Sequence, residues 1–156
     1  MYTVRTDAAG TKSRPAFCPP ATVLEIEGAE TRLATRFPGT LKSLLLECDG
    51  IMDKLSVDGG PYFDNMWLLW PVSQIVDENI AFRKRIAETS SNRTGHDSVF
   101  IASAGVDGIL FGIEATDKPR DDCPIVCWYP IEDRICELAD TLAGFVDGWL
   151  SSRIAV

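Results

Sequence analysis

Histidine and paired cysteines are what this sequence has least of. Its single histidine, His96, stands beside Asp97 in a polar stretch, although histidine is the commonest general acid or base and the commonest metal ligand in proteins. The odd number of cysteines and the lack of a C-x-x-C pair argue against a disulfide framework and a zinc site. We therefore expect reduced thiols, no metal and no cofactor. The cysteines are Cys18, Cys48, Cys123, Cys127 and Cys136.

The chain also lacks a hydrophobic run long enough to cross a membrane. Its longest uncharged apolar stretch, residues 66–75, is interrupted by Pro71 and Gln74, whereas a spanning helix needs about 20 apolar residues. Residues 1–20 are charged and lack the apolar block of about 7–15 residues that a signal peptide requires. We expect no membrane partner and a cytoplasmic location.

Positive charge is scarce, and most of the acidic excess is C-terminal. The formal net charge is −8, and residues 101–156 hold four basic and ten acidic side chains. Such a balance repels a phosphate backbone, whose binding depends on lysine and arginine, so we expect no nucleic-acid partner. A basic protein is the better candidate partner.

The rest of the composition is that of a folded globular protein, with 46% apolar and 24% charged residues. A length of 156 residues is typical of one domain with one core. Residues 1–20 end in Cys-Pro-Pro, which disfavours helix before that point. We expect an N-terminal arm over residues 1–20 and a single domain over 21–156.

Two helices are predicted in the first third of the chain. Thr22, followed three residues later by Glu25, is typical of a capping box, and apolar residues at helical spacing predict a helix over residues 22–35. A Pro-Gly pair at 38–39 ends it. A second short helix with one apolar face then runs to an Asp-Gly pair at 49–50, whose glycine suits a left-handed turn.

The later segments alternate between strand and helix patterns. Residues 51–62 are predicted as turns, and the apolar residues at 135–150 recur at spacings of one and three, which indicates a long amphipathic C-terminal helix. Between them the patterns predict a strand over 66–70, a helix from Ser73 to about residue 87 with Ile80 on its apolar side, a loop over 89–97, a hairpin over 99–113 and a strand over 125–129.

This order of elements resembles the SUKH superfamily, also called the Smi/Knr family, over about residues 20–153. The residues that carry the resemblance are Pro19-Pro20-Ala21-Thr22, Phe37-Pro38, Asp49-Gly50, Trp70-Pro71-Val72, Asp107-Gly108-Ile109-Leu110-Phe111 and the run from Leu138 to Leu150. The resemblance implies an α+β fold in which a curved antiparallel sheet is flanked by helices. In bacteria it implies an immunity protein that neutralises a secreted or contact-delivered toxin.

Our leading hypothesis is therefore a non-catalytic domain that binds a basic toxin through shape and charge. We expect acidic residues in turns and at strand ends around one sheet edge to form the partner-binding surface, with two tyrosines as aromatic anchors. We also expect Glu137, Asp140 and Asp147 to form an acidic stripe on the C-terminal helix. The predicted partner-binding residues are Asp107, Glu114, Asp117, Asp121, Asp122, Tyr62 and Tyr129.

Two other readings of the same sequence stay open. Other members of the family resemble intracellular regulators or scaffolds, which would bind several cellular proteins. An enzyme using the carboxylates or Cys48 as its catalytic group is the second alternative, and it requires a deep site with perturbed titrating residues. The oligomeric state and the identity of a toxin are not encoded in any motif of the chain.

The predicted C-terminal helix gives a direct test, because Trp149 lies on its apolar face. Truncating a buried aromatic side chain costs about 3–5 kcal/mol, a large share of the roughly 5–15 kcal/mol that stabilises a domain. We expect Trp149→Ala to melt at a much lower temperature than the wild type in thermal unfolding followed by circular dichroism. An unchanged midpoint would show that this helix does not pack on the core.

Overall fold

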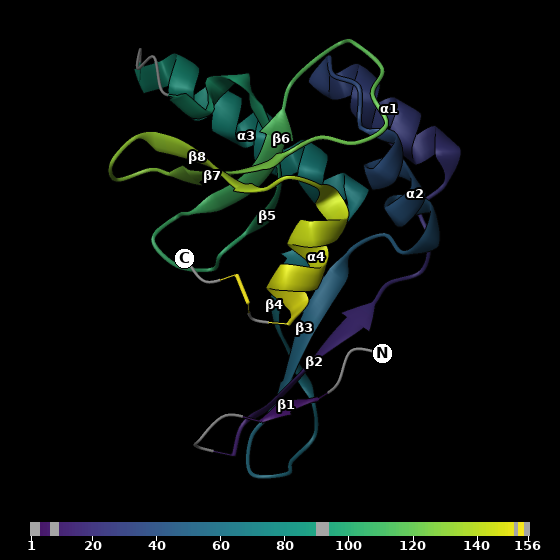
Figure 1. The fold of residues 1–156 in the computed structure, drawn as a ribbon, viewed down its shortest axis with the longest axis vertical. Helices are drawn as coiled ribbons and strands as arrows, with labels where there is room; N and C mark the ends of the chain where they lie inside the picture. The colour runs from purple at the N-terminus through teal and green to yellow at the C-terminus, as the bar shows by residue number, and fades with distance from the viewer. Residues whose placement is uncertain (1–3, 7–9, 90–93, 152, 155–156) are drawn as a thin grey trace.

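Two antiparallel four-stranded sheets and four α-helices form the part of the chain that the computed structural model describes, residues 4–6, 10–89, 94–151 and 153–154. The predicted α+β class is confirmed. The first sheet extends away from the helices, which gather around the second sheet (Figure 1). Among the helices in these described ranges, none has the length and apolar character to cross a membrane.

The chain order of the elements separates the two sheets. The first sheet has the order β1-β2-β3-β4 and the second β5-β6-β7-β8, so every pairing joins strands that are consecutive in sequence. The strands are β1 (Arg5–Thr6), β2 (Lys12–Phe17), β3 (Ile51–Ser56), β4 (Phe63–Leu69), β5 (Ser98–Ser103), β6 (Leu110–Glu114), β7 (Ile125–Tyr129) and β8 (Arg134–Ala139). The helices are α1 (Val23–Leu33), α2 (Gly39–Glu47), α3 (Val72–Thr89) and α4 (Leu142–Leu150), and a 3₁₀ turn, η1, spans Thr94–Asp97.

Local signals set the helix starts. The predicted capping box of α1 is confirmed, because the Glu25 N–H donates to Thr22 Oγ1 at 3.2 Å and the Thr22 N–H donates to Glu25 Oε2 at 2.7 Å. Ser73 does not cap α3, which already begins at Val72. Instead, the Val72 N–H donates to Asp49 Oδ1 at 2.7 Å, so a carboxylate from the α2–β3 turn satisfies the first turn of α3.

A β-bulge in β5 is the place where α3 and the end of β4 are hydrogen-bonded to the second sheet. The pairing of β5 with β6 shifts register between Phe100 and Ala102, which leaves groups of the bulged strand without ladder partners. Asn79 of α3 supplies the missing partners. The Phe100 N–H donates to Asn79 Oδ1 at 2.8 Å, and Asn79 Nδ2 donates to the Phe100 carbonyl at 2.7 Å. The Ile101 carbonyl accepts from the Trp70 N–H at 2.9 Å, which links β5 to the end of β4.

The second sheet packs on both faces. On one face Phe82 of α3 lies edge-on to Phe100 and Trp128, with ring centroids 4.9 and 5.0 Å away. On the other face Phe111 contacts the rings of Phe145 and Trp149 of α4 at 5.3 and 5.0 Å.

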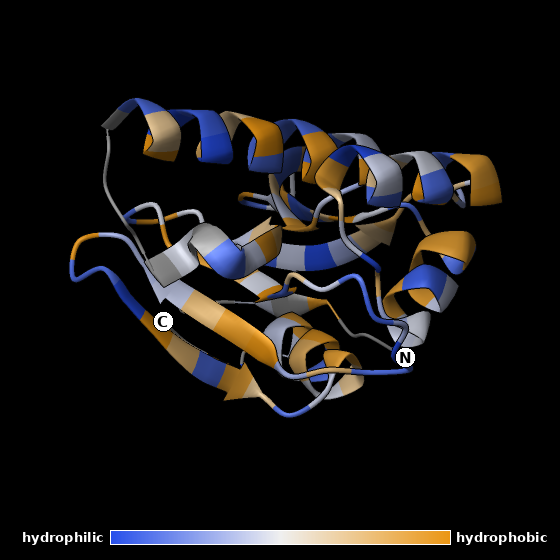
Figure 2. Ribbon diagram, turned by 90° about the horizontal axis from the view of Figure 1, so that it is seen from above, coloured by the Kyte–Doolittle hydropathy of each residue, from blue (hydrophilic) through white to orange (hydrophobic). Residues whose placement is uncertain are grey.

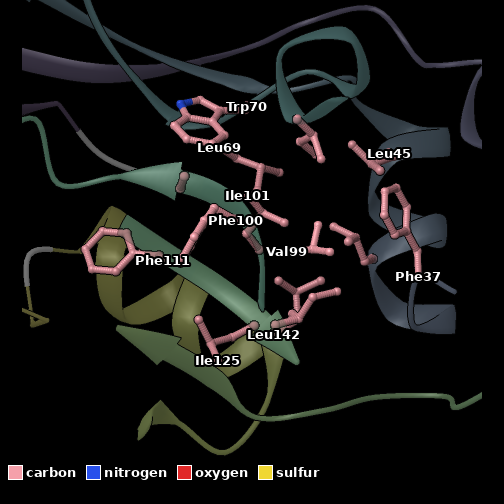
Figure 3. Close-up of a cluster of buried hydrophobic side chains, with 14 of the residues drawn as sticks. Phe37, Leu45, Leu69, Trp70, Val99, Phe100, Ile101, Phe111, Ile125 and Leu142 are labelled. Atoms are coloured by element: carbon pink, nitrogen blue, oxygen red, sulfur yellow. The ribbon is translucent and has the colours of Figure 1, made fainter. Parts of the chain in front are cut away.

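Side chains of α2, of the α1–α2 connection and of α3 complete this core. Figure 3 shows Phe37 and Leu45 pointing toward Val99 of the sheet. Hydrophobic and hydrophilic residues alternate along α3 (Figure 2), as expected for a helix with one buried face. Ile80, predicted on that face, is 41% exposed, and the buried position beside it belongs to Asn79.

The predicted C-terminal helix is confirmed only from Leu142 onward. Residues 134–139 form β8, in which Cys136 lies opposite Cys127 of β7. The turn before β8 contains Asp133 at φ +47°, and it reverses the chain so that β8 pairs with β7. The helix starts afresh at Thr141, whose side chain accepts from the Gly144 N–H at 3.0 Å.

The N-terminal half contains strands that the sequence patterns missed. Residues 12–17, expected to lie in a loose arm, pair with β3 from Lys12 opposite Ser56 to Phe17 opposite Ile51. Residues 51–56, predicted as turns, form β3 itself. The expected antiparallel sheet is thus accompanied by a second one built from the first 70 residues.

The clamp between α3 and the bulge predicts a large effect for one buried polar side chain. Asn79→Ala leaves a buried N–H and a buried carbonyl of Phe100 without partners, and each such group costs about 1–3 kcal/mol. We expect the free energy of unfolding, measured by urea titration, to fall by about 2–4 kcal/mol. The control is Ile80→Ala on the exposed side, expected within about 0.5 kcal/mol of the wild type. Equal losses in both variants would contradict the clamp.

Candidate functional site

The loop between β6 and β7 docks onto the start of α2. Pro38, the N-cap of α2, gives no side-chain cap, and the first N–H groups of a helix need external acceptors. The Gly39 N–H donates to the Arg120 carbonyl at 2.9 Å, and the Thr40 N–H donates to the Asp121 carbonyl at 2.8 Å. The loop therefore has a fixed position against the helix.

Asp122 extends this contact to α4. Its Oδ1 accepts from Thr40 Oγ1 at 3.0 Å, from the Cys123 N–H at 2.9 Å and from the Leu142 N–H at 3.3 Å. One carboxylate oxygen thus binds the N-terminal ends of α2 and α4 to the same loop. We call this arrangement the Asp122 clamp.

Glu30 holds the other side of α2. This carboxylate is 4% exposed and accepts from the Phe37 N–H at 2.7 Å, from Lys42 Nζ at 2.8 Å and from an Arg36 guanidinium N–H at 3.3 Å. Burial alone would raise its pKa, but the hydrogen bonds from Lys42 and Phe37 and the two cations lower the pKa of Glu30 below its ordinary value. The Lys42 ammonium group is therefore ion-paired with the ionised carboxylate of Glu30.

Beyond the Asp122 clamp, α2 and α4 border an open groove with a volume of about 780 Å³. We call it the α2–α4 groove. Its apolar part consists of Leu44, Leu142, Ala143 and Val146, of which Leu142 is buried. Its remaining lining residues are one glycine and five polar or acidic residues, namely Gly39, Thr40, Ser43, Glu47, Asp121 and Asp147.

Two unpaired carboxylates give this groove a negative potential. Glu47 and Asp121 are exposed and form no ion pair with any residue in the described ranges, whereas Asp147 pairs with Arg153. The nearby cations Lys42 and Arg120 are held elsewhere, by Glu30 and Glu114. An apolar floor between unneutralised carboxylates favours a ligand that is both apolar and basic.

The structure brings only some of the predicted partner-binding residues together. Asp121 lines the α2–α4 groove and Asp122 lies beneath its end, where its carboxylate serves the clamp. Asp117 borders a separate hollow beside Arg36. Glu114 ends β6 and pairs with Arg120 at 3.6 Å.

The other predicted residues lie elsewhere. Asp107, at φ +51°, occupies the β5–β6 turn, at the opposite end of β6 from Glu114. Tyr129 of β7 is half-buried, with the Arg134 guanidinium 4.5 Å from its ring centroid. Tyr62 belongs to the β3–β4 connection of the first sheet and has Arg14 4.1 Å from its ring centroid.

The prediction of an acidic stripe on the C-terminal helix is wrong. Glu137 belongs to β8 and Asp140 to the connection that follows it, so only Asp147 lies on α4.

The residue that pattern analysis missed is Glu47. It follows Leu44 by three residues on α2, and this helical spacing between a leucine and an acidic residue was the signal available in the sequence.

The buried thiols lack the lowered pKa of a cysteine nucleophile. Burial raises the pKa of the Cys48 and Cys123 thiols, and the same cause raises that of Cys127, whereas a reactive cysteine needs a lowered pKa. No group of three or more histidine, cysteine or acidic side chains within the described ranges is arranged to hold a metal ion. The predicted surface position of His96 concerns a side chain outside the described part of the structure.

The chain matches a known protein family. The family model described as SMI1/KNR4 (SUKH-1) matches residues 20–148, which include α1 to the greater part of α4. No curated protein matches the chain.

The Asp122 clamp makes a prediction that separates two adjacent aspartates. Asp122→Ala removes the acceptor of three hydrogen bonds, including one from the first N–H of α4, and we expect a loss of about 1–3 kcal/mol in urea unfolding. Asp121→Ala removes an exposed carboxylate and should stay within about 0.5 kcal/mol of the wild type. Asp122→Asn keeps an acceptor oxygen and should recover part of the loss. Identical unfolding midpoints for the two alanine variants would contradict the clamp.

Proposed function

The chain belongs to the SMI1/KNR4 family (SUKH-1), and we propose that it is an immunity protein that neutralises a bacterial toxin by binding it. The family is known for immunity proteins, which supports this role. The chain would act in the cytoplasm of the cell that makes the toxin. Its five free cysteines are in keeping with a reducing compartment.

The observation that carries the proposal is the α2–α4 groove. It combines an apolar floor with the exposed carboxylates of Glu47 and Asp121, neither of which is neutralised by a described residue. Apolar contacts supply affinity, and complementary charge raises the rate of encounter with a basic partner. A basic toxin domain whose active surface enters this groove would be occluded from its substrate.

Neutralisation by binding also agrees with the chemistry of the described side chains. The elevated pKa of Cys48 keeps its thiol protonated near neutral pH, which weighs against the alternative of a cysteine nucleophile. Glu47 and Asp121, the exposed carboxylates of the groove, form no ion pair with a described residue that could adjust either of them as a general base. The proposed contribution of the chain is shape and charge.

A growth-rescue assay tests this function. The product of the reading frame next to the gene for this chain is expressed in a heterologous bacterium, where we expect it to stop growth, and co-expression of the wild-type chain should restore growth. The double variant Glu47→Lys, Asp121→Lys should fail to rescue while its unfolding midpoint stays close to that of the wild type, because both positions are exposed.

The matched control is Asp77→Lys, Glu88→Lys, which makes the same change in net charge on α3. We expect it to rescue as well as the wild type. Failure of the wild-type chain to rescue growth would overturn the immunity function and favour the scaffold alternative. Rescue by the Glu47, Asp121 variant would remove the groove from the proposal.

A further inference from the structure

Both walls of the α2–α4 groove are helix faces, which limits how a protein partner is held there. Thr40, Leu44 and Glu47 of α2 recur at spacings of four and three residues, and Leu142 and Val146 of α4 are four apart. Interior backbone groups of a helix are bonded within the helix. These walls therefore offer no free strand edge, which pairing with an extended partner segment requires, and recognition must come from side chains.

The Asp122 clamp also fixes the distribution of charge along the groove. It draws the N-terminal ends of α2 and α4 together beside Asp121, while Glu47 and Asp147 lie in the last turns of their helices. Thr40 and Glu47 are seven residues apart, which is about 10 Å along a helix. Carboxylates thus occur at both ends, with apolar side chains between them.

We propose that the α2–α4 groove receives a basic amphipathic α-helix of its protein partner. This inference rests on the proposed function and specifies the element of the partner that is bound. Two or three helical turns would place apolar side chains at i, i+3 and i+4 against Leu44, Ala143 and Val146. Lysine or arginine at either end of that helix would face Asp121 at one end and Glu47 at the other.

A helix fits these walls better than an extended segment. Helices pack with axes about 8–10 Å apart, and a third helix can lie in the depression between two others. An extended chain directs alternate side chains away from the groove, so it would bring fewer apolar side chains onto the floor. Helix-in-groove recognition uses apolar anchors of this spacing.

Labelled peptides test the inference without a known partner. One peptide of about 15 residues, near the shortest length that is helical in water, contains alanine, three leucines on one helical face and lysines at both ends. A second peptide has the same composition with the leucines dispersed around the helix. By fluorescence anisotropy with the full chain, we expect the first to bind at least about tenfold more tightly than the second.

Matched arginine substitutions locate the binding. Ala143→Arg on the exposed face of α4 places bulk and positive charge in the groove, and it should weaken binding of the first peptide by about tenfold or more. Ala81→Arg, at an exposed position of α3, should leave binding unchanged. Equal affinity for the two peptides, no saturable binding, or no effect of Ala143→Arg would overturn the inference.

The outcomes separate this inference from the proposed function. If the Glu47→Lys, Asp121→Lys variant fails to rescue growth but the two peptides bind alike, the groove binds a partner that is not helical. If the first peptide, with its leucines on one helical face, binds in the groove but the wild-type chain does not rescue growth, the helix site is retained and the immunity function is overturned.

Discussion

A single carboxylate oxygen determines where the two helices of the candidate binding surface lie. Asp122 Oδ1 accepts hydrogen bonds from the Thr40 hydroxyl and the Leu142 N–H, at the beginning of α2 and of α4, while the backbone of the same loop serves the first N–H groups of α2. A groove between two short helices has a defined width only if the helices are fixed relative to each other. The charged rim at Asp121 and Glu47 depends on that arrangement, in which the Asp122 carboxylate is occupied by hydrogen bonds within the chain.

The Asp122 clamp in turn depends on a rigid sheet beneath it. The bulge at Ile101 joins β5 to β4, and Asn79 binds the interrupted strand to α3, so the second sheet is held on the face away from α4. On the α4 face, Phe111 packs against Phe145 and Trp149. The loop that carries Asp122 connects β6 and β7, the two central strands of this sheet. Its position is therefore set by the core, and the groove inherits that rigidity.

Sequence patterns identified the elements whose signals are local. The capping box at Thr22 and the apolar run of β7 each depend on a few neighbouring residues, and both were predicted at nearly their observed positions. Residues 135–139 fit a helical spacing equally well, and only pairing with β7 across a turn makes them a strand. The candidate site was predicted least well, because Asp121 and Glu47 are far apart in sequence and line the same groove only through the docking of the β6–β7 loop on α2. The pattern of acidic residues showed the sign of the surface but not which residues share it.

The central claim is that the partner occupies the α2–α4 groove. Methyl-group NMR of the isotopically labelled chain, titrated with a toxin domain whose growth arrest the chain relieves, tests it most directly. We expect the largest chemical-shift changes at the methyl groups of Leu44, Leu142 and Val146, with little change in the first sheet. Unchanged shifts at these three residues, with large changes around Leu55 of β3 or Leu110 of β6, would contradict it.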